Sequence, residues 1–243
     1  MNLVVDIGNT FCKVALFEKG KEVYSGQQSN FNMEYCRQLK EKNPETKNII
    51  VSSVAKNNID ERIFSLFENS ILVDENTSLP IKVKYETGST LGKDRLAAAV
   101  GAYTLFPDDN LLVIDAGTAI TFDFVSKEGI YCGGNISPGL NTRFKSLHHF
   151  TGRLPLVTHG ENDLTLTARS TKQAIASGVY FGMIYEIHGY IKDYETRYGK
   201  IKTIITGGDA NYFVEKLKNS IFVVFNLNMI GLNRILEYNV IEN

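Results

Sequence analysis

The chain has 243 residues, of which 43% are hydrophobic and 22% are charged, and this balance is that of a folded globular protein, not of a disordered or collagen-like chain. At this length roughly 70 to 75% of the surface of the unfolded chain can be buried, enough for one large core or two smaller ones. The 26 basic and 27 acidic side chains leave a formal net charge of −1, without the positive excess that nucleic-acid binding needs, so we expect no nucleic-acid partner.

The first half of the chain predicts an antiparallel meander followed by alternating helices and strands. Short β-rich runs are separated by turn residues at 8–10 and 19–21, and helical spacing of apolar residues begins after them. In chain order we expect strands over 3–7, 12–17 and 22–25, a helix over 33–42, a strand over 48–53, and helices over 60–68 and 92–106.

The second half repeats this opening. Strands are predicted over 112–118, 120–125 and 129–136, followed by a helix over 171–192, a strand over 202–206, and helices over 211–218 and 228–238. The apolar strands that end in Asp6-Ile7-Gly8 and Asp115-Ala116-Gly117 start 109 residues apart, about the size of a small domain. We therefore predict an internal duplication that forms two α/β domains, residues 1–109 and 110–243, with a cleft between them.

Cysteine usage and hydropathy indicate a cytoplasmic protein. Cys12, Cys36 and Cys132 are odd in number and far apart, which fits neither a disulfide framework nor a zinc site and indicates a reducing compartment. The first residues lack the pattern of a signal peptide, and no window approaches 18 apolar residues. We expect no membrane association.

The two Asp-x-Gly turns are candidate phosphate-binding loops. Glycine lets backbone N–H groups approach an anion closely, and the aspartate places a carboxylate at the end of the strand. Taken alone, the turn at 6–10 could equally be a plain hairpin, because Asn and Gly are common turn residues. The second turn at 115–118 favours the functional interpretation, in which both turns hold the phosphates of a nucleotide and the aspartates hold Mg²⁺ through water.

The segment at 88–94 has a partial resemblance to a P-loop, but three residues separate its glycines where four are required, and Asp94 stands where Ser or Thr binds Mg²⁺. We reject that interpretation. Asp94 could act as a general base with Arg95 holding an anionic acceptor, or it could simply stabilise the start of a helix. The loops at 133–139 and 206–210 could likewise line a ligand or serve as turns and helix caps.

These motifs, in this order, resemble those of the type III pantothenate kinases over nearly the whole chain. They are Asp6-Ile7-Gly8-Asn9-Thr10, Gly92-Lys93-Asp94-Arg95, Asp115-Ala116-Gly117-Thr118, the loop at 133–139, Thr171 with Ser177-Gly178, and Thr206-Gly207-Gly208. The Asp-x-Gly turns occur throughout the acetate kinase, sugar kinase, Hsp70 and actin superfamily, whereas the complete ordered set is specific. The resemblance implies two RNase H-like (actin-like ATPase) domains and ATP-dependent phosphorylation of pantothenate, the first step of coenzyme A biosynthesis.

The resemblance also implies roles for particular residues. Asp94 would be the proton acceptor, Asp115 the ligand of a monovalent cation, K⁺ or NH₄⁺, and Asp6 a ligand of Mg²⁺ through water. The ATP-binding residues would be Asp6, Ile7, Gly8, Asn9, Thr10, Phe11, Cys12, Lys13 and Thr118. The residues that contact pantothenate would be Tyr85, Gly92, Lys93, Asp94, Arg95 and Thr171.

Alternative functions on the same fold remain open at this point. They are a non-catalytic regulatory protein, a nucleotide-switched binding module of the actin or Hsp70 kind, and a kinase for another small acid or sugar. Ala174, Gly178 and Gly182 recur every four residues, so they share one helix face, which could pack on another helix or on the sheet of the chain itself. The resemblance implies a homodimer with shared active sites, in which Thr171 reaches pantothenate bound mainly by the neighbouring chain.

Overall fold

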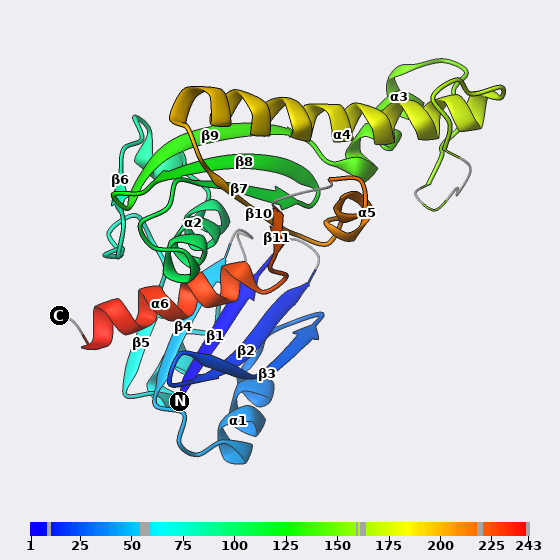
Figure 1. The fold of residues 1–243 in the computed structure, drawn as a ribbon. Coiled ribbons are helices and arrows are strands. Elements are labelled where there is room, and N and C mark those ends of the chain that lie inside the picture. The colour runs from blue at the N-terminus through cyan, green and yellow to red at the C-terminus, as the bar shows by residue number, and fades with distance from the viewer. Residues whose placement is uncertain (9–10, 54–58, 159, 161–163, 218–220, 242–243) are drawn as a thin grey trace. The chain divides into compact units, whose positions relative to one another are not determined.

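The computed structural model describes residues 1–8, 11–53, 59–158, 160, 164–217 and 221–241 (Figure 1). The chain divides into two compact units. The first, unit 1, comprises Met1–Asp108, Glu128–Cys132 and Asn226–Asn243, and the second, unit 2, comprises Asp109–Lys127 and Gly133–Phe225. Among the described residues, no helix combines the length and the apolar character needed to cross a membrane.

Unit 1 is built on a five-stranded sheet of order β3-β2-β1-β4-β5. The meander of the first three strands is antiparallel, and β4 and β5 then continue the sheet in parallel with β1. The elements are β1 (Asn2–Ile7), β2 (Cys12–Glu18), β3 (Lys21–Gln28), α1 (Met33–Lys42), β4 (Asn48–Ser53), the 3₁₀ helix η1 (Glu61–Leu66), β5 (Asn69–Leu72), β6 (Lys82–Val83), the 3₁₀ helix η2 (Gly88–Thr90), α2 (Lys93–Leu105) and α6 (Leu227–Ile241).

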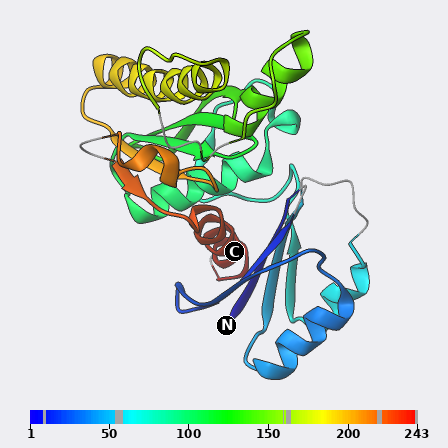
Figure 2. The same ribbon diagram turned by 90° about the vertical axis from the view of Figure 1, so that its right-hand side faces the viewer.

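Side chains alternate across the first sheet and so bring different helices to its two faces (Figure 2). Leu3 and Val5 of β1 share a core with Cys36 and Leu39 of α1. The residues of β1 that alternate with Leu3 and Val5 point to the opposite face, where the Asn2 side chain donates a hydrogen bond to Asn233 of α6. Asp6 follows the same alternation as Asn2, so its carboxylate lies on the α6 face of β1.

Unit 2 repeats the topology of unit 1. Its strands have the order β11-β10-β7-β8-β9, which corresponds to β5-β4-β1-β2-β3 of the first sheet. The first residues of β9 belong to unit 1, where Ile130 and Tyr131 pair with β6. The elements are β7 (Leu111–Ala116), β8 (Ala119–Ser126), β9 (Ile130–Pro138), α3 (Leu140–Phe150), α4 (Thr171–Tyr198), β10 (Lys202–Thr206), α5 (Asn211–Val214) and β11 (Ile221–Val223). This repeated arrangement confirms the expected fold class of two RNase H-like α/β domains.

The core of unit 2 lies under the long helix α4. Phe122 of β8 stacks on Tyr190 with ring centroids 4.0 Å apart, and Phe124 stacks on Tyr198 at 4.2 Å. The sequence placed these tyrosines beyond or near the end of a shorter helix over 171–192. The aromatic pairs supply the burial that carries α4 on to Tyr198, and Gly199, with φ of +77°, ends it.

The C-terminal helix α6 joins unit 1 and not unit 2. The expected domain boundary near Asp109 therefore coincides with the first junction between the units, but a single cut there does not separate them. The physical reason is that α6 packs along α2 and the first sheet (Figure 1). Two of the expected helices are also shorter than predicted, since 60–68 forms only the 3₁₀ turn η1 and 211–218 only the short α5.

Candidate active site

The first Asp-x-Gly turn lies at the carboxyl end of β1, where open α/β sheets place their ligands. The backbone N–H of Gly8 donates to the carbonyl oxygen of Phe11 at 3.0 Å and closes the hairpin. Cys12 is buried at the start of β2, and the Phe11 side chain is 51% exposed. Asn9 and Thr10, which the sequence predicts to bind ATP, lie outside the described residues.

Two neighbouring strands supply side chains next to Asp6. Lys13 stands opposite Asp6 in the antiparallel register of β2, and Ser52 stands beside it in the parallel register of β4. The Ser52 hydroxyl is fully buried, and its proximity lowers the pKa of the Asp6 carboxyl. The distance and angles between the two groups do not meet the criteria for a hydrogen bond. Sequence reasoning missed Ser52, because only the strand register shows that it follows β1 across the sheet.

Asp94 occupies the first turn of α2, which begins directly after Gly92. Its Oδ1 accepts a hydrogen bond of 2.8 Å from the backbone N–H of Arg95. A methyl group on Gly92 would overlap the same oxygen, so glycine is required for the carboxylate to lie where it does. Arg95 is 7% exposed, and Lys93 is half-buried.

Electrostatics connects the two carboxylates of unit 1. Burial raises the pKa of Asp6 to about 6, Lys13 opposes this rise, and the negative charge of Asp94 adds to it. Asp6 and Asp94 therefore lie within electrostatic reach of each other, although they are 88 positions apart in the sequence. The fold thus brings together two residues for which the sequence predicts separate roles.

The second Asp-x-Gly turn, in unit 2, is held by two loops that the sequence singles out separately. Gly117 N–H donates to Ala119 O at 3.0 Å, which closes the turn itself. Gly139 N–H and the Thr142 hydroxyl both donate to Thr118 O, at 3.1 and 2.6 Å. From the other side, Asp209 N–H donates to Ala116 O at 2.9 Å. These bonds hold the backbone of the turn at the carboxyl end of β7.

Glycine is required at two positions around this second turn. A methyl group on Gly139 would overlap the carbonyl oxygens of the turn, and Gly207 combines a similar overlap with a φ of +94°. Thr206, just before Gly207, lies beside Asp115 in the parallel register of β10, as Ser52 lies beside Asp6. The duplication therefore extends to the hydroxyl group that neighbours each aspartate.

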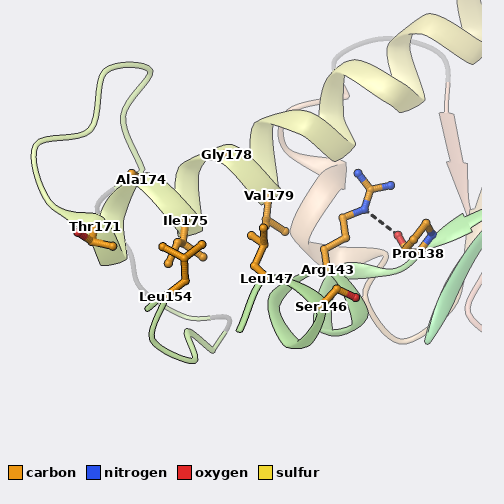
Figure 3. Close-up of a pocket in the computed structure, with 10 residues that line it drawn as sticks. All are labelled: Pro138, Arg143, Ser146, Leu147, Leu154, Thr171, Ala174, Ile175, Gly178 and Val179. Carbon is orange, nitrogen blue, oxygen red and sulfur yellow. Dashed lines mark hydrogen bonds between the residues drawn. The ribbon is translucent and has the colours of Figure 1, made fainter. Parts of the chain in front are cut away.

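Tyr85 and Thr171, the remaining residues predicted to contact pantothenate, lie on other elements than Asp94. Tyr85 packs its ring near Tyr131, with centroids 6.1 Å apart, in unit 1. Thr171 is the exposed first residue of α4 in unit 2, at one end of a groove of about 640 Å³ (Figure 3). The groove is mostly apolar, and its lining residues are Pro138, Arg143, Ser146, Leu147, Leu154, Thr171, Ala174, Ile175, Gly178 and Val179.

The small residues of α4 do not pack on the sheet of this chain. Ala174 and Gly178 are exposed and line the groove, whereas Ile175 and Val179, which also line it, are buried in the core of unit 2. A methyl group on Gly178 or Gly182 would contact nothing within 4 Å. Of the two alternatives that the sequence leaves open for this face, packing on the chain's own sheet is therefore wrong.

The carboxylates fit a hydrated hard cation better than a closed metal cage. Among the residues that the structure describes, no three His, Cys, Asp or Glu side chains are grouped so that they could hold a metal ion. Mg²⁺ usually keeps several waters and is bound through one or two carboxylates together with substrate phosphates. Asp6, whose carboxyl pKa is raised by burial and by the like charge of Asp94, is a single carboxylate donor of that kind.

We predict that Asp6→Asn stabilises the nucleotide-free protein at neutral pH. A carboxyl with a higher pKa in the folded than in the unfolded state binds more protons when folded, so its ionisation destabilises the fold as the pH rises from about 4 through 6. Urea unfolding should give the variant about 1 to 3 kcal/mol more stability than wild type at pH 7.5 and little at about pH 3.5, below the unfolded pKa. The exposed Asp193→Asn is the control, and a gain that does not change with pH would contradict the prediction.

The chain is similar to known proteins in both sequence and fold. The sequence profile of the family described as "Type III pantothenate kinase" matches residues 2–193. A protein of that name from Cytophaga hutchinsonii is 42% identical over 240 residues, which cover 99% of this chain and all of the relative.

Two solved structures share the fold. A Campylobacter jejuni protein, described as a Baf family transcriptional activator, is 25% identical with a TM-score of 0.62, covering 98% of each chain. A ROK family glucokinase from Streptomyces griseus has a TM-score of 0.54 at 12% identity, covering 97% of this chain and 99% of its own. The full-length match to the Cytophaga relative and the family profile together identify this chain: it belongs to the type III pantothenate kinase family.

Proposed function

We propose that this protein transfers the γ-phosphoryl group of ATP to pantothenate, forming 4'-phosphopantothenate and ADP in the first step of coenzyme A biosynthesis. The observation that carries the proposal is the position of Asp94 at the start of α2, within electrostatic reach of Asp6 at the end of β1. A carboxylate base beside a phosphate turn is the minimum that phosphoryl transfer to an alcohol needs, since the reaction depends mainly on positioning and charge stabilisation.

In this mechanism Asp94 accepts the proton of the pantothenate hydroxyl as its oxygen attacks the γ-phosphorus. The bond from the γ-phosphorus to the bridging oxygen breaks, and that oxygen leaves with ADP. Gly92, Lys93, Arg95 and Tyr85 would hold pantothenate, and the buried guanidinium of Arg95 suits its carboxylate. The hydrogen bond from Arg95 N–H keeps Asp94 Oδ1 in place for the proton transfer.

The residues from Asp6 to Lys13 and Thr118 would bind ATP, with turn N–H groups and the Lys13 ammonium offsetting phosphate charge. Asp6 would hold Mg²⁺ through water, and Asp115 would hold K⁺ or NH₄⁺. These cations would neutralise negative charge on the phosphates. The chain itself, which has no P-loop lysine, supplies little positive charge for this purpose. The raised pKa of Asp6 supports this assignment, because a bound cation would favour the ionised form of a carboxylate that burial disfavours.

A homodimer is the assembly that the exposed face of α4 supports best. Thr171, Ala174 and Gly178 share an open, mostly apolar groove, and the exposed small residues allow another helix to approach closely. We propose that Thr171 of one chain contacts pantothenate bound mainly by its partner.

One alternative function has an observation in its favour. The similar Campylobacter protein is described as a transcriptional activator, so a regulator without catalytic activity is the second candidate. The net charge of −1 argues against direct contact with DNA phosphates.

We predict that the purified protein releases ADP with pantothenate and not with acetate or hexoses, and that Na⁺ in place of K⁺ sharply lowers the rate. Asp115→Ala should remove the difference between the two salts, because it removes the proposed ligand of the monovalent cation. A coupled ADP-release assay measures both effects. Absence of turnover with every acceptor would favour the regulator, and equal rates of wild type in both salts would exclude the role of Asp115.

We predict that Asp94→Asn lowers kcat by about 10² to 10⁴, the usual cost of losing a general base. Folding and nucleotide binding should persist, because no proposed cation ligand is removed. Steady-state rates between pH 6 and 9 and nucleotide titration check this, with Asp193→Asn as the surface control. More than a tenth of the wild-type activity across that range would show that Asp94 is not the base.

We predict that Asp94→Ala and Thr171→Arg chains, each inactive alone, regain activity when mixed. Random exchange gives about half heterodimers, and under two-fold symmetry each of these has one site with both defects and one with neither. About a quarter of wild-type activity should therefore return. If tagged subunits demonstrably exchange and activity stays absent, Asp94 and Thr171 serve the same site from one chain.

A further inference from the structure

The helices α2 and α6 cross in unit 1 with their backbones in direct contact (Figure 1). A methyl group on Gly231 would overlap the carbonyl oxygen of Ala97 and lie 2.8 Å from the backbone nitrogen of Gly101. A methyl group on Gly101 would overlap the carbonyl oxygen of Leu227 and lie 3.1 Å from the nitrogen of Gly231. Neither glycine can be replaced unless the two helices move apart.

The other side of α6 is tied to the strand that carries Asp6. Asn233, only 3% exposed, accepts a hydrogen bond from the Asn2 side chain at 2.9 Å and donates one to Glu237 at 3.0 Å. Asn2 in turn accepts from Asn48 at 2.8 Å, and Asn48 accepts from Asn69 at 2.8 Å. This row of amides crosses β1, β4 and β5, so α6 is anchored to the sheet and not only to β1.

We infer that α6 is a spacer that sets the distance between Asp6 and Asp94, and that Gly231 is a positioning residue for the reaction; the inference rests on the proposed function. Asp94 lies three residues before Ala97, one turn along the same helix, so a displacement of Ala97 carries the carboxylate with it. Asp6 lies on the α6 face of β1, four residues after Asn2. One helix therefore contacts the two elements that present the two carboxylates.

Glycine at this crossing has a cost that close packing alone does not require. Each glycine inside a helix costs about 1 kcal/mol relative to alanine, and helices pack stably at larger separations when alanine or larger residues lie between them. Gly101 and Gly231 instead bring α2 as near to α6 as two backbones allow. We attribute this close approach to the position that Asp94 must occupy.

The test is Gly231→Ala, with Gly189→Ala as the matched control, because Gly189 is also inside a helix but has open space around it. We expect Gly231→Ala to lower kcat at least 10-fold while the KM for ATP stays within about 3-fold, since misplacement by about 1 Å can cost about 10² in rate. Gly189→Ala should keep the wild-type kcat. Nucleotide titration gives the concentration of folded sites, so lost stability is not counted as lost kcat.

If Gly231→Ala fails to fold, Asn233→Ala decides the question. It introduces no overlap and removes the hydrogen bond between α6 and Asn2 of β1. We expect kcat to fall at least 3-fold with the KM for ATP retained. A wild-type kcat per folded site, in Gly231→Ala or in this second variant, overturns the inference. Wild type that does not phosphorylate pantothenate in the same assay instead refutes the proposed function, so the two failures are distinguishable.

Discussion

Burial of the Asp6 carboxyl at the end of β1 is the constraint to which its neighbours in unit 1 respond. Asp6 at the end of β1 and Asp94 at the start of α2 lie within electrostatic reach of each other, and burial together with the like charge of Asp94 raises the pKa of Asp6 to about 6. Lys13 across the β1–β2 hairpin and the Ser52 hydroxyl on β4 oppose the rise. The protein compensates the negative charge of Asp6 only in part, and a phosphate-bound cation would compensate the remainder.

The duplication explains why each aspartate stands where it does. Both sheets run in the same strand order, and both place an aspartate at the carboxyl end of the central strand, followed by a tight turn. In both, the next parallel strand places a hydroxyl residue beside the aspartate, Ser52 in one unit and Thr206 in the other. The two copies differ in what surrounds the turn. Contacts through Gly139 and Gly207 hold the second turn from both sides, whereas Asp6, before the first turn, lies within electrostatic reach of Asp94 in α2.

Close backbone approach is the means by which both units hold these turns and helices. Gly139 and Gly207 let neighbouring loops reach the second turn, Gly92 leaves room for the Asp94 carboxylate, and Gly101 and Gly231 let α2 and α6 touch. In each case a single methyl group would displace a backbone segment or a carboxylate oxygen. These glycines cost helix propensity or chain entropy, and they allow backbones and the Asp94 carboxylate to lie closer than other residues would permit.

Local patterns in the sequence by themselves determined the alternation of strands and helices, the helix start at Asp94 and both Asp-x-Gly turns, because each depends on neighbours within a few residues. The duplication followed from comparing two such local patterns 109 residues apart. The neighbours of Asp6 depended on tertiary structure. Strand register placed Ser52 and Lys13 beside it, and the packing of α2 on α6, more than 120 residues later in the chain, accompanies the position of Asp94. The return of α6 to unit 1 also lay beyond local pattern. Its apolar residues predict a buried helix but do not say against which surface, because burial energy is non-directional and only the tertiary packing selects the partner.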